Sequence, residues 1–258
     1  MKVPFLDFKK EWEIFGKDFV EAFEKFGKGG YYVLGPEVEE FEQKFAEYCG
    51  YQYAVGVSSG LAALEVALLS KGVGPGDEVI TVSNSAVATA LAISNIGAKP
   101  VFCDIGEDFL IDTNKIENLI TEKTKAILPV HLFGKICNME KINEIVQKHG
   151  LEIIEDACQA HGSKFEGESL KNIKAFSFYP TKNLGALGEA GIILTNSEKE
   201  RDFALSYRNY GQEKRYHHTI KGNNYRIDAL QCVFLNIKLK NLDNSVKIRK
   251  NIAQLYIE

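Results

Sequence analysis

Short runs rich in valine and isoleucine alternate with amphipathic segments through most of the chain, and this alternation limits its fold more than any other feature. The runs are almost continuously apolar, which is typical of strands that are covered on both faces. Strands that alternate with helices form a parallel sheet with right-handed crossovers. The strand-like runs are YAVGVSS (53–59), EVITVSN (78–84), KPVFCDI (99–105), KAILPVHL (125–132) and LEIIEDA (151–157). The sequence therefore predicts an α/β fold, a mostly parallel sheet sandwiched by helices.

The segments between and beyond these runs favour helices. EVEEFEQKFAEYCG (37–50) has apolar residues at helical spacing and ends at a glycine, and TNKIENLI (113–120) has a shorter helical pattern. Two further strands are expected at IKAFSFYP (173–180) and AGIILTN (190–196), joined by a loop that carries Lys182. From Ser197 onward the sequence predicts helices, the last one from about Arg226 to the chain end.

Composition narrows the class of protein. The 258 residues carry a formal net charge of -4, which argues against nucleic-acid or membrane-surface binding because both partners demand a basic excess. Five dispersed cysteines contain no CxxC pair and indicate reduced thiols. No metal-ligand spacing, signal-peptide pattern or membrane-length apolar segment is present. We expect a cytoplasmic protein without a metal, a nucleic-acid partner or a membrane partner.

Two strand ends carry polar residues that suit a ligand. Ser59 and Gly60 follow the first strand and begin an Ala/Leu-rich helix, whose N-terminal N–H groups can bind a phosphate. An ordinary serine N-cap explains the same residues. Asp156 ends the strand at 151–157, with Gln159 just beyond it. Its carboxylate could hold a metal, act as a base or pair with a cationic ring nitrogen, or could be a plain surface acid.

The third strand end is AFSFYPTKNLGALGEAG (175–191), where one lysine, Lys182, stands among apolar residues and glycines. Desolvation disfavours the charged form of a lysine, so the pKa of Lys182 is expected to fall and its neutral amine to become a nucleophile. A lysine whose stem lies on apolar surface with its head in water is the alternative. A phosphate-binding turn, an acid for a pyridinium nitrogen and a nucleophilic lysine together are the parts that hold pyridoxal phosphate.

Five motifs occur in order along the chain: PGDEVITVSN (75–84), KAILPVHLFG (125–134), IIEDACQAHG (153–162), the lysine segment and GNNYRIDALQ (222–231). In these motifs the chain resembles the DegT/DnrJ/EryC1/StrS family of pyridoxal-phosphate-dependent sugar aminotransferases. The resemblance covers nearly the whole chain and implies the fold-type-I transferase architecture. It also implies that residues 1–235 form the cofactor-binding large domain with an N-terminal helical segment. Residues 236–258 would then begin a linker helix toward a smaller C-terminal domain that the sequence lacks.

The resemblance implies a role for each matched residue. Lys182 matches the Schiff-base lysine, which would also act as the acid and base of the 1,3-proton shift. Asp156 matches the carboxylate that keeps the pyridine nitrogen protonated, and Gln159 the residue that bonds the ring hydroxyl. Ser177 matches a hydroxyl donor to the phosphate, for which Ser59 and Gly60 begin the binding turn. Asn224 matches a residue that reaches the phosphate in the neighbouring subunit, which implies a homodimer.

Other positions match less simply. His131 and Arg226 stand at positions typical of the family, without a clear role. Leu61 replaces a threonine of the phosphate turn, and Ala86 replaces an aromatic residue that stacks on the ring, so what stacks there stays open. Arg208, Lys214, Arg215, His217 and His218 could meet a diphosphate or form an ordinary solvated surface.

The function expected from the residues and the resemblance is amino transfer, with glutamate as donor, to the keto group of a nucleotide-linked sugar. A cyclitol ketone is a possible alternative acceptor. Sugar dehydratases of the family replace the lysine with histidine, so Lys182 argues against that reaction. The remaining alternative is a degenerate relative with a regulatory role that binds the cofactor or a partner, since fold alone does not determine function.

Overall fold

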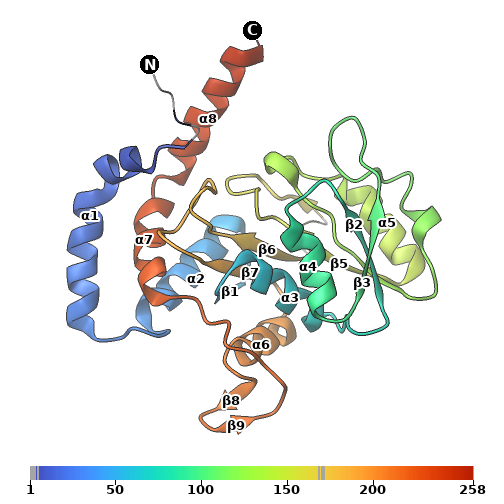
Figure 1. Ribbon diagram of the computed structural model, residues 1–258, viewed down its shortest axis with the longest axis horizontal. Coiled ribbons are helices and arrows are strands. Elements are labelled where there is room, and N and C mark those ends of the chain that lie inside the picture. The colour runs from blue at the N-terminus through green and yellow to red at the C-terminus, as the bar shows by residue number, and fades with distance from the viewer. Residues whose placement is uncertain (1–3, 5, 168, 170–171, 258) are drawn as a thin grey trace.

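The computed structural model describes residues 4, 6–167, 169 and 172–257. Its centre is a seven-stranded sheet in the order β1-β7-β6-β5-β4-β2-β3 (Figure 1). β7 is antiparallel to both of its neighbours, and the other adjacent pairs are parallel. The strands are β1 Tyr53–Val57, β2 Glu78–Val82, β3 Lys99–Cys103, β4 Thr124–Ile127, β5 Glu152–Asp156, β6 Ile173–Ser177 and β7 Gly191–Thr195. The predicted α/β fold with a mostly parallel sheet is confirmed.

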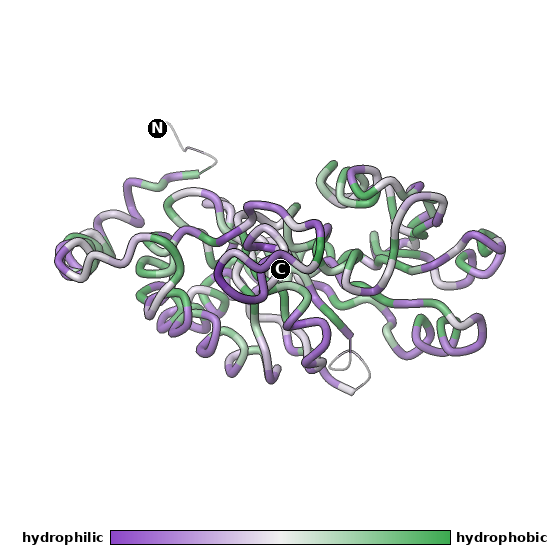
Figure 2. The backbone as a smooth tube through the Cα atoms, turned by 90° about the horizontal axis from the view of Figure 1, so that it is seen from below, coloured by the Kyte–Doolittle hydropathy of each residue, from purple (hydrophilic) through white to green (hydrophobic). Residues whose placement is uncertain are grey.

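Helices lie on both faces of this sheet (Figure 1), and hydrophobic and hydrophilic residues alternate along them in Figure 2. The helices are α1 Phe8–Gly29, α2 Pro36–Cys49, α3 Gly60–Ser70, α4 Val87–Asn95, α5 Met139–His149, α6 Glu198–Tyr207, α7 Ala229–Leu239 and α8 Leu242–Ile257. Along β7, Ile193 faces the core beneath α3, whereas Ile192 and Leu194 face the core beneath α2 and α7. This alternation with period two gives each face of the sheet its own apolar layer.

Three expected elements differ from the observed ones. The pattern at 113–120 forms only a 3-10 turn, η1 Glu117–Leu119, because Thr124 Oγ accepts the Thr121 N–H group and starts β4. Between α6 and α7 the chain forms a hairpin of β8 Gln212–Lys214 and β9 His217–His218 instead of a helix. In place of the single helix expected from about Arg226 to the chain end, there are two helices, α7 beginning at Ala229 and α8 beginning at Leu242, with a break at residues 240–241.

The interruption bears on the predicted boundary at residue 235. α7 continues through that position and packs against α1 and α2, while α8 leaves the core after Leu242, which is its one fully buried residue within the described chain. In Figure 1, α8 projects away from the sheet at the top of the molecule. The division into residues 1–235 and 236–258 stays a prediction. Within the described ranges, no helix combines the length and the apolarity needed to cross a membrane.

Arg208 does not belong to the exposed basic cluster in which the sequence placed it. Its side chain is buried, and its Nη1 lies 2.5 Å from Glu42 Oε1 and 2.7 Å from the Gly56 carbonyl oxygen. The same Glu42 oxygen accepts the Gly56 N–H group at 2.6 Å. Arg208 therefore joins α6, α2 and β1 through one buried ion pair. Lys214, by contrast, is exposed on β8.

Replacing Arg208 by methionine should destabilise the fold by about 3 kcal/mol, because it leaves the Glu42 carboxylate buried without its partner. Lys214→Met is the matched control, since it removes one positive charge from an exposed site and should change the free energy of unfolding by less than about 0.5 kcal/mol. Urea denaturation of both variants measures the difference. Equal destabilisation, or none in either variant, would contradict the structural role of Arg208.

Candidate active site

The turn after β1 offers backbone donors to an anion. Ser59 is the N-cap of α3, and its Oγ accepts the Ala62 N–H group at 3.1 Å. Within the described residues, the N–H groups of Gly60 and Leu61 find no acceptor, as is usual in the first turn of a helix. These two donors and the helix dipole behind them suit a phosphate. The Leu61 side chain packs against the core, so the residue contributes through its backbone.

Glycines bring this turn against two other strand ends. A Cβ atom placed on Gly60 would lie 2.5 Å from Ser177 Cβ and 3.1 Å from Cys158 Sγ. A Cβ atom on Gly191, the first residue of β7, would lie 2.2 Å from the Ser59 carbonyl oxygen. The ends of β1, β5 and β6 therefore meet at one edge of the sheet, where ligands of open α/β sheets bind.

Asp156 ends β5 and is 4% exposed. Its Oδ1 accepts the Cys158 N–H group at 3.1 Å, and its Oδ2 accepts the Thr89 hydroxyl at 2.8 Å. A carboxylate has about four acceptor positions, so this one can accept a further donor from a ligand. Burial and the neighbouring Asp156 charge keep the pKa of the Cys158 thiol well above its ordinary value. The thiol therefore stays neutral beside the carboxylate.

Gln159 and Lys182 line the same pocket, which has a volume of about 360 Å³. The Phe133 N–H group donates to Gln159 Oε1 at 3.0 Å, which orients the carboxamide. Phe133 has φ of 56°, which is rare for a bulky residue, and its ring is 81% exposed at the pocket. Thr181 and Asn183 complete the lining.

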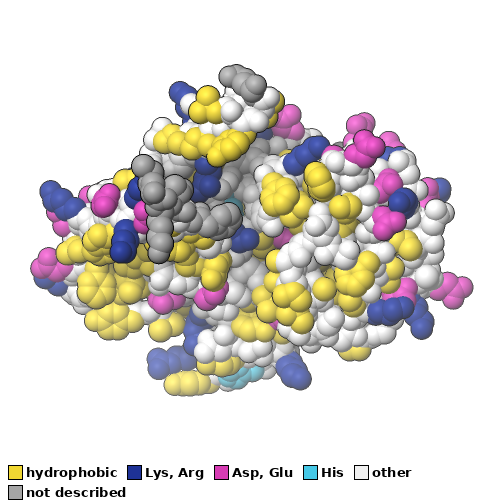
Figure 3. Space-filling model, turned by 45° about the horizontal axis from the view of Figure 1, so that its top comes forward, with side chains coloured by type: hydrophobic (Ala, Val, Ile, Leu, Met, Phe, Trp, Pro, Cys, Tyr) yellow, Lys and Arg dark blue, Asp and Glu magenta, His cyan; other side chains and the backbone are white. Residues whose placement is uncertain are grey.

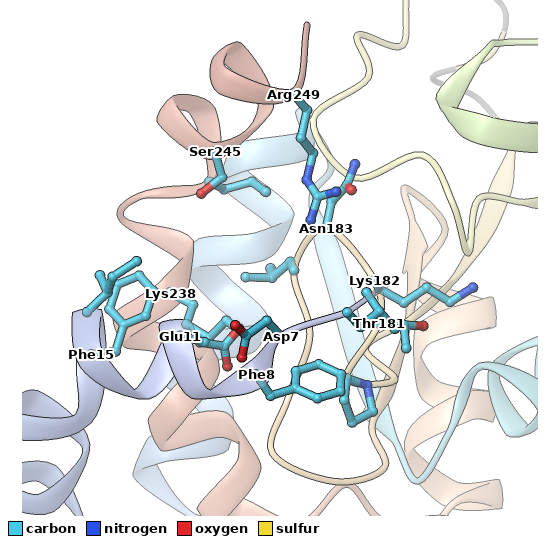
Figure 4. Close-up of a pocket in the computed structure, with 15 residues that line it drawn as sticks. Asp7, Phe8, Glu11, Phe15, Thr181, Lys182, Asn183, Lys238, Ser245 and Arg249 are labelled. Carbon is cyan, nitrogen blue, oxygen red and sulfur yellow. The ribbon is translucent and has the colours of Figure 1, made fainter. Parts of the chain in front are cut away.

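The lysine loop is a tight and anchored turn. The Lys182 N–H group donates to the Tyr179 carbonyl at 2.9 Å, and a Cβ atom on Gly185 would lie 2.3 Å from the Pro180 carbonyl oxygen. Lys238 of α7 donates to the Gly185 carbonyl and pairs with Glu11 of α1 at 2.7 Å. Figure 4 shows the Lys182 side chain extending away from Asp7, Glu11 and Lys238.

Charged side chains of both signs line the hollow next to this loop. The cavity drawn in Figure 4 has a volume of about 300 Å³ and lies between α1, the lysine loop and α8. Arg249 of α8 lines this cavity and also a neighbouring one that reaches His161 and Ser163. Figure 3 shows the hollow, with lysine and arginine side chains at its edge. Asp7 and Glu11 offset part of this positive charge, and the excess that remains suits an anionic substrate.

His131 lies behind the site. It is fully buried, and its Nε2 lies 2.7 Å from Glu155 Oε2, which also pairs with Lys174 Nζ at 2.7 Å. Burial alone would raise the pKa of Glu155, but the hydrogen bond from His131 and the charge of Lys174 hold it below its ordinary value. These three residues link β5 to β6 on the opposite side of β5 from the Asp156 side chain. They do not line the pocket.

Asn224 and Arg226 lie on the segment that precedes α7, and Arg226 forms a β-bridge with Val57 at the end of β1. Asn224 is exposed and forms a β-bridge with Asn209, and Arg226 donates to Asn209 Oδ1 at 2.8 Å. Tyr225, which lies between them, accepts the Ser58 N–H group at 2.8 Å through its carbonyl oxygen. The segment therefore runs past the β1–α3 turn.

The structure thus gathers Ser59, Gly60, Asp156, Gln159, Ser177 and Lys182 around one edge of the sheet. Their roles stay predictions. Sequence reasoning missed Thr89 and Phe133. Thr89 is a polar, β-branched residue in the first turn of the otherwise apolar α4, which is a signal, but its partner lies 67 residues away. His, Cys, Asp and Glu side chains of the described residues form no group of three suited to a metal.

Comparison with known proteins agrees with this fold. The chain belongs to the DegT/DnrJ/EryC1/StrS aminotransferase family, whose model matches residues 13–258. It is 42% identical over 260 residues to the dTDP-3-amino-3,4,6-trideoxy-alpha-D-glucose transaminase of Streptomyces venezuelae, covering 99% of this chain and 69% of that protein. The predicted family and the predicted aminotransferase class are therefore confirmed.

Two solved structures have the same architecture. S. venezuelae DesV in complex with a ketimine intermediate has a TM-score of 0.90 at 42% identity, covering 94% of this chain and 67% of that one. NtdA from Bacillus subtilis with bound cofactor PMP has a TM-score of 0.89 at 36% identity, covering 94% of this chain and 57% of that one. These neighbours confirm the fold-type-I architecture that the resemblance implies.

Gly191→Ala should distort the Ser59–Gly60 turn, because the added methyl group meets the Ser59 carbonyl at 2.2 Å. Overpacking of this kind costs about 1–3 kcal/mol, and the affinity for pyridoxal phosphate should fall as well. Gly74→Ala is the matched control, since a Cβ atom there meets nothing within 4 Å. Thermal unfolding and cofactor titration of both variants measure the effects. A Gly191→Ala variant that behaves like Gly74→Ala would contradict the close approach.

His161 should make stability depend on pH. Burial, and then the nearby Lys182 charge, lower the pKa of His161 from 6.5 to about 3. The contribution of His161 to stability is fully present above the pKa of the unfolded state and decreases as the pH falls below that value. At lower pH the unfolded chain binds a proton at His161, whereas the folded chain does not. Between pH 6.5 and pH 5 this loss amounts to about 2 kcal/mol.

His161→Phe removes the titrating group from between the rings of Phe176 and Phe178, whose centroids lie 5.3 and 5.6 Å from that of His161. Urea denaturation at both pH values should show a smaller loss of stability for this variant than for the wild type. His217→Phe, at an exposed position of β9, should keep the wild-type loss. Identical losses in all three proteins would contradict this role of His161.

Proposed function

We propose that this protein is a pyridoxal-phosphate-dependent aminotransferase that moves an amino group from glutamate to the keto group of a nucleotide-linked sugar. One observation carries the proposal: the anion-binding turn, a buried carboxylate and a lysine come together at one edge of the sheet. The name of the S. venezuelae relative, a transaminase of a dTDP-linked amino sugar, supports the same substrate class.

The residues fit the cofactor in shape and in chemistry. The cradle that a Cβ atom on Gly60 would fill, with the unpaired N–H groups of Gly60 and Leu61, suits the phosphate, and the Ser177 hydroxyl borders it. Asp156 can accept an N–H group of the ring, since its two observed donors leave acceptor positions unused. Gln159, oriented by Phe133, would donate its amide to the ring hydroxyl.

Pyridoxal phosphate, when bound, supplies an electron-withdrawing ring that stabilises negative charge on the carbon that loses its proton. Lys182 Nζ would hold the cofactor covalently and, once released, carry the proton between the cofactor carbon and the substrate carbon. Asp156 would keep the ring nitrogen protonated. Both cavities beside the lysine loop would exclude bulk water from the amine when substrate fills them.

The cationic hollow supports an anionic substrate. In the neighbouring cavity of about 550 Å³, Arg249 and Lys250 on α8 line the space together with the loop at 161–164. A sugar nucleotide carries two phosphates, and glutamate carries two carboxylates, so both substrates would gain from this positive surface.

The proposal includes a cytoplasmic homodimer. Asn224 is exposed, so it is accessible to the site of a partner subunit, as the family resemblance implies. Five dispersed cysteines without a CxxC pair support a reducing compartment.

The test is an absorbance titration of the purified protein with pyridoxal phosphate, followed by addition of glutamate. We expect a visible band that glutamate bleaches, with formation of 2-oxoglutarate. Lys182→Ala should lose the band, because no amine remains to hold the cofactor, and should lose at least about 10³-fold in amino transfer. A keto sugar nucleotide added afterwards should restore the band as the amino group leaves the enzyme.

Lys199→Ala, which removes an exposed lysine from α6, is the matched control and should keep the band and the rate. Cofactor binding without bleaching by any amino donor would contradict the proposed enzyme and favour a binding protein. Bleaching by glutamate without transfer to any nucleotide-linked keto sugar would contradict the proposed acceptor alone.

A further inference from the structure

The two oxygens of Asp156 are held by donors of different origin. Oδ1 accepts the Cys158 N–H group at 3.1 Å, a bond within the strand end itself. Oδ2 accepts the hydroxyl of Thr89 at 2.8 Å, which comes from α4 on a distant part of the chain. Both groups are almost completely buried, Thr89 at 1% and Asp156 at 4% exposed. The hydroxyl bond is therefore protected from competing water.

A second hydroxyl determines the direction of this hydrogen bond. Ser85 Oγ lies 2.7 Å from Thr89 Oγ1, and either oxygen could donate to the other. A hydroxyl has one proton, and an ionised carboxylate only accepts. Because Thr89 uses its proton on Asp156, Ser85 must donate to Thr89. The chain Ser85 to Thr89 to Asp156 then has every proton directed toward the carboxylate, and such chains strengthen each member.

The position of Thr89 in α4 is otherwise unfavourable. It stands in the first turn of a nine-residue helix, where its β-branched side chain lowers helix propensity. The Thr89 side chain also ties the start of α4 to the end of β5, beside Ala86. A valine at position 89 would have the same shape and would pack equally well. Packing therefore does not explain why this residue carries a hydroxyl group.

We propose that Thr89, supported by Ser85, is a positioning residue that keeps the Asp156 carboxylate aimed at the pyridine nitrogen of the cofactor. This inference rests on the proposed function. Donors to a charged carboxylate stabilise its ionised form and restrict its rotation. Without the Thr89 hydroxyl, Oδ2 loses its donor in a buried site, and the carboxylate holds the ring nitrogen less firmly.

The experiment uses the full chain loaded with pyridoxal phosphate. Thr89→Val removes the hydroxyl at constant shape and should raise the dissociation constant of pyridoxal phosphate about tenfold. It should also move the pH midpoint of the visible band upward, because a less protonated ring withdraws less charge from the nitrogen of Lys182. Thr89→Ser should restore both values, and Ser85→Ala should raise the dissociation constant about threefold.

Thr81→Val is the matched control. Thr81 is also fully buried, but its hydroxyl donates at 2.8 Å to the Leu128 carbonyl and not to the Asp156 carboxylate. This variant should lose thermal stability without changing cofactor affinity or the pH midpoint. If Thr89→Val behaves like Thr81→Val, or if Thr89→Ser is as impaired as Thr89→Val, the inference is wrong while the proposed function stands. A wild-type protein that binds no pyridoxal phosphate overturns both.

Discussion

The contact between Gly191 and the Ser59 carbonyl determines how the site is assembled. β7 enters the sheet between β1 and β6 in the opposite direction, so its first residue meets the last residues of its neighbours. Any side chain at Gly191 would push the β1–α3 turn away from Ser177 and Cys158. Because there is none, the anion-binding turn and the ends of β5 and β6 share one edge, and the lysine loop returns to that edge from β6.

Buried charges hold this edge from behind. Glu155 lies next to Asp156 on β5, and it faces the opposite way, toward His131 and Lys174. Arg208 and Glu42 similarly join α6, α2 and β1. Removal of either partner would leave an uncompensated charge in a low-dielectric interior, so these pairs keep the strands in one arrangement. Lys182 can then lie partly exposed on its loop, while these buried ion pairs hold the strands on either side of the site.

Much of the fold and the site could be predicted from the sequence, because the signals are local. Valine and isoleucine runs mark the strands, and polar residues at strand ends mark the site. The helical pattern at 113–120 was misleading because it is too short to outweigh the turn at Thr121 and Thr124. The basic cluster was misleading because burial of Arg208 depends on Glu42, which lies 166 residues away. Thr89 could not be assigned for the same reason, since its partner is set by the packing of α4 against β5.

The central claim is that three strand ends hold one cofactor, and a crystal structure of the protein with pyridoxal phosphate tests it most directly. The account predicts the phosphate at the N–H groups of Gly60 and Leu61 beside Ser177, the ring nitrogen against Asp156, and electron density continuous with Lys182 Nζ. A phosphate bound elsewhere, or a ring whose nitrogen faces away from Asp156, would contradict it.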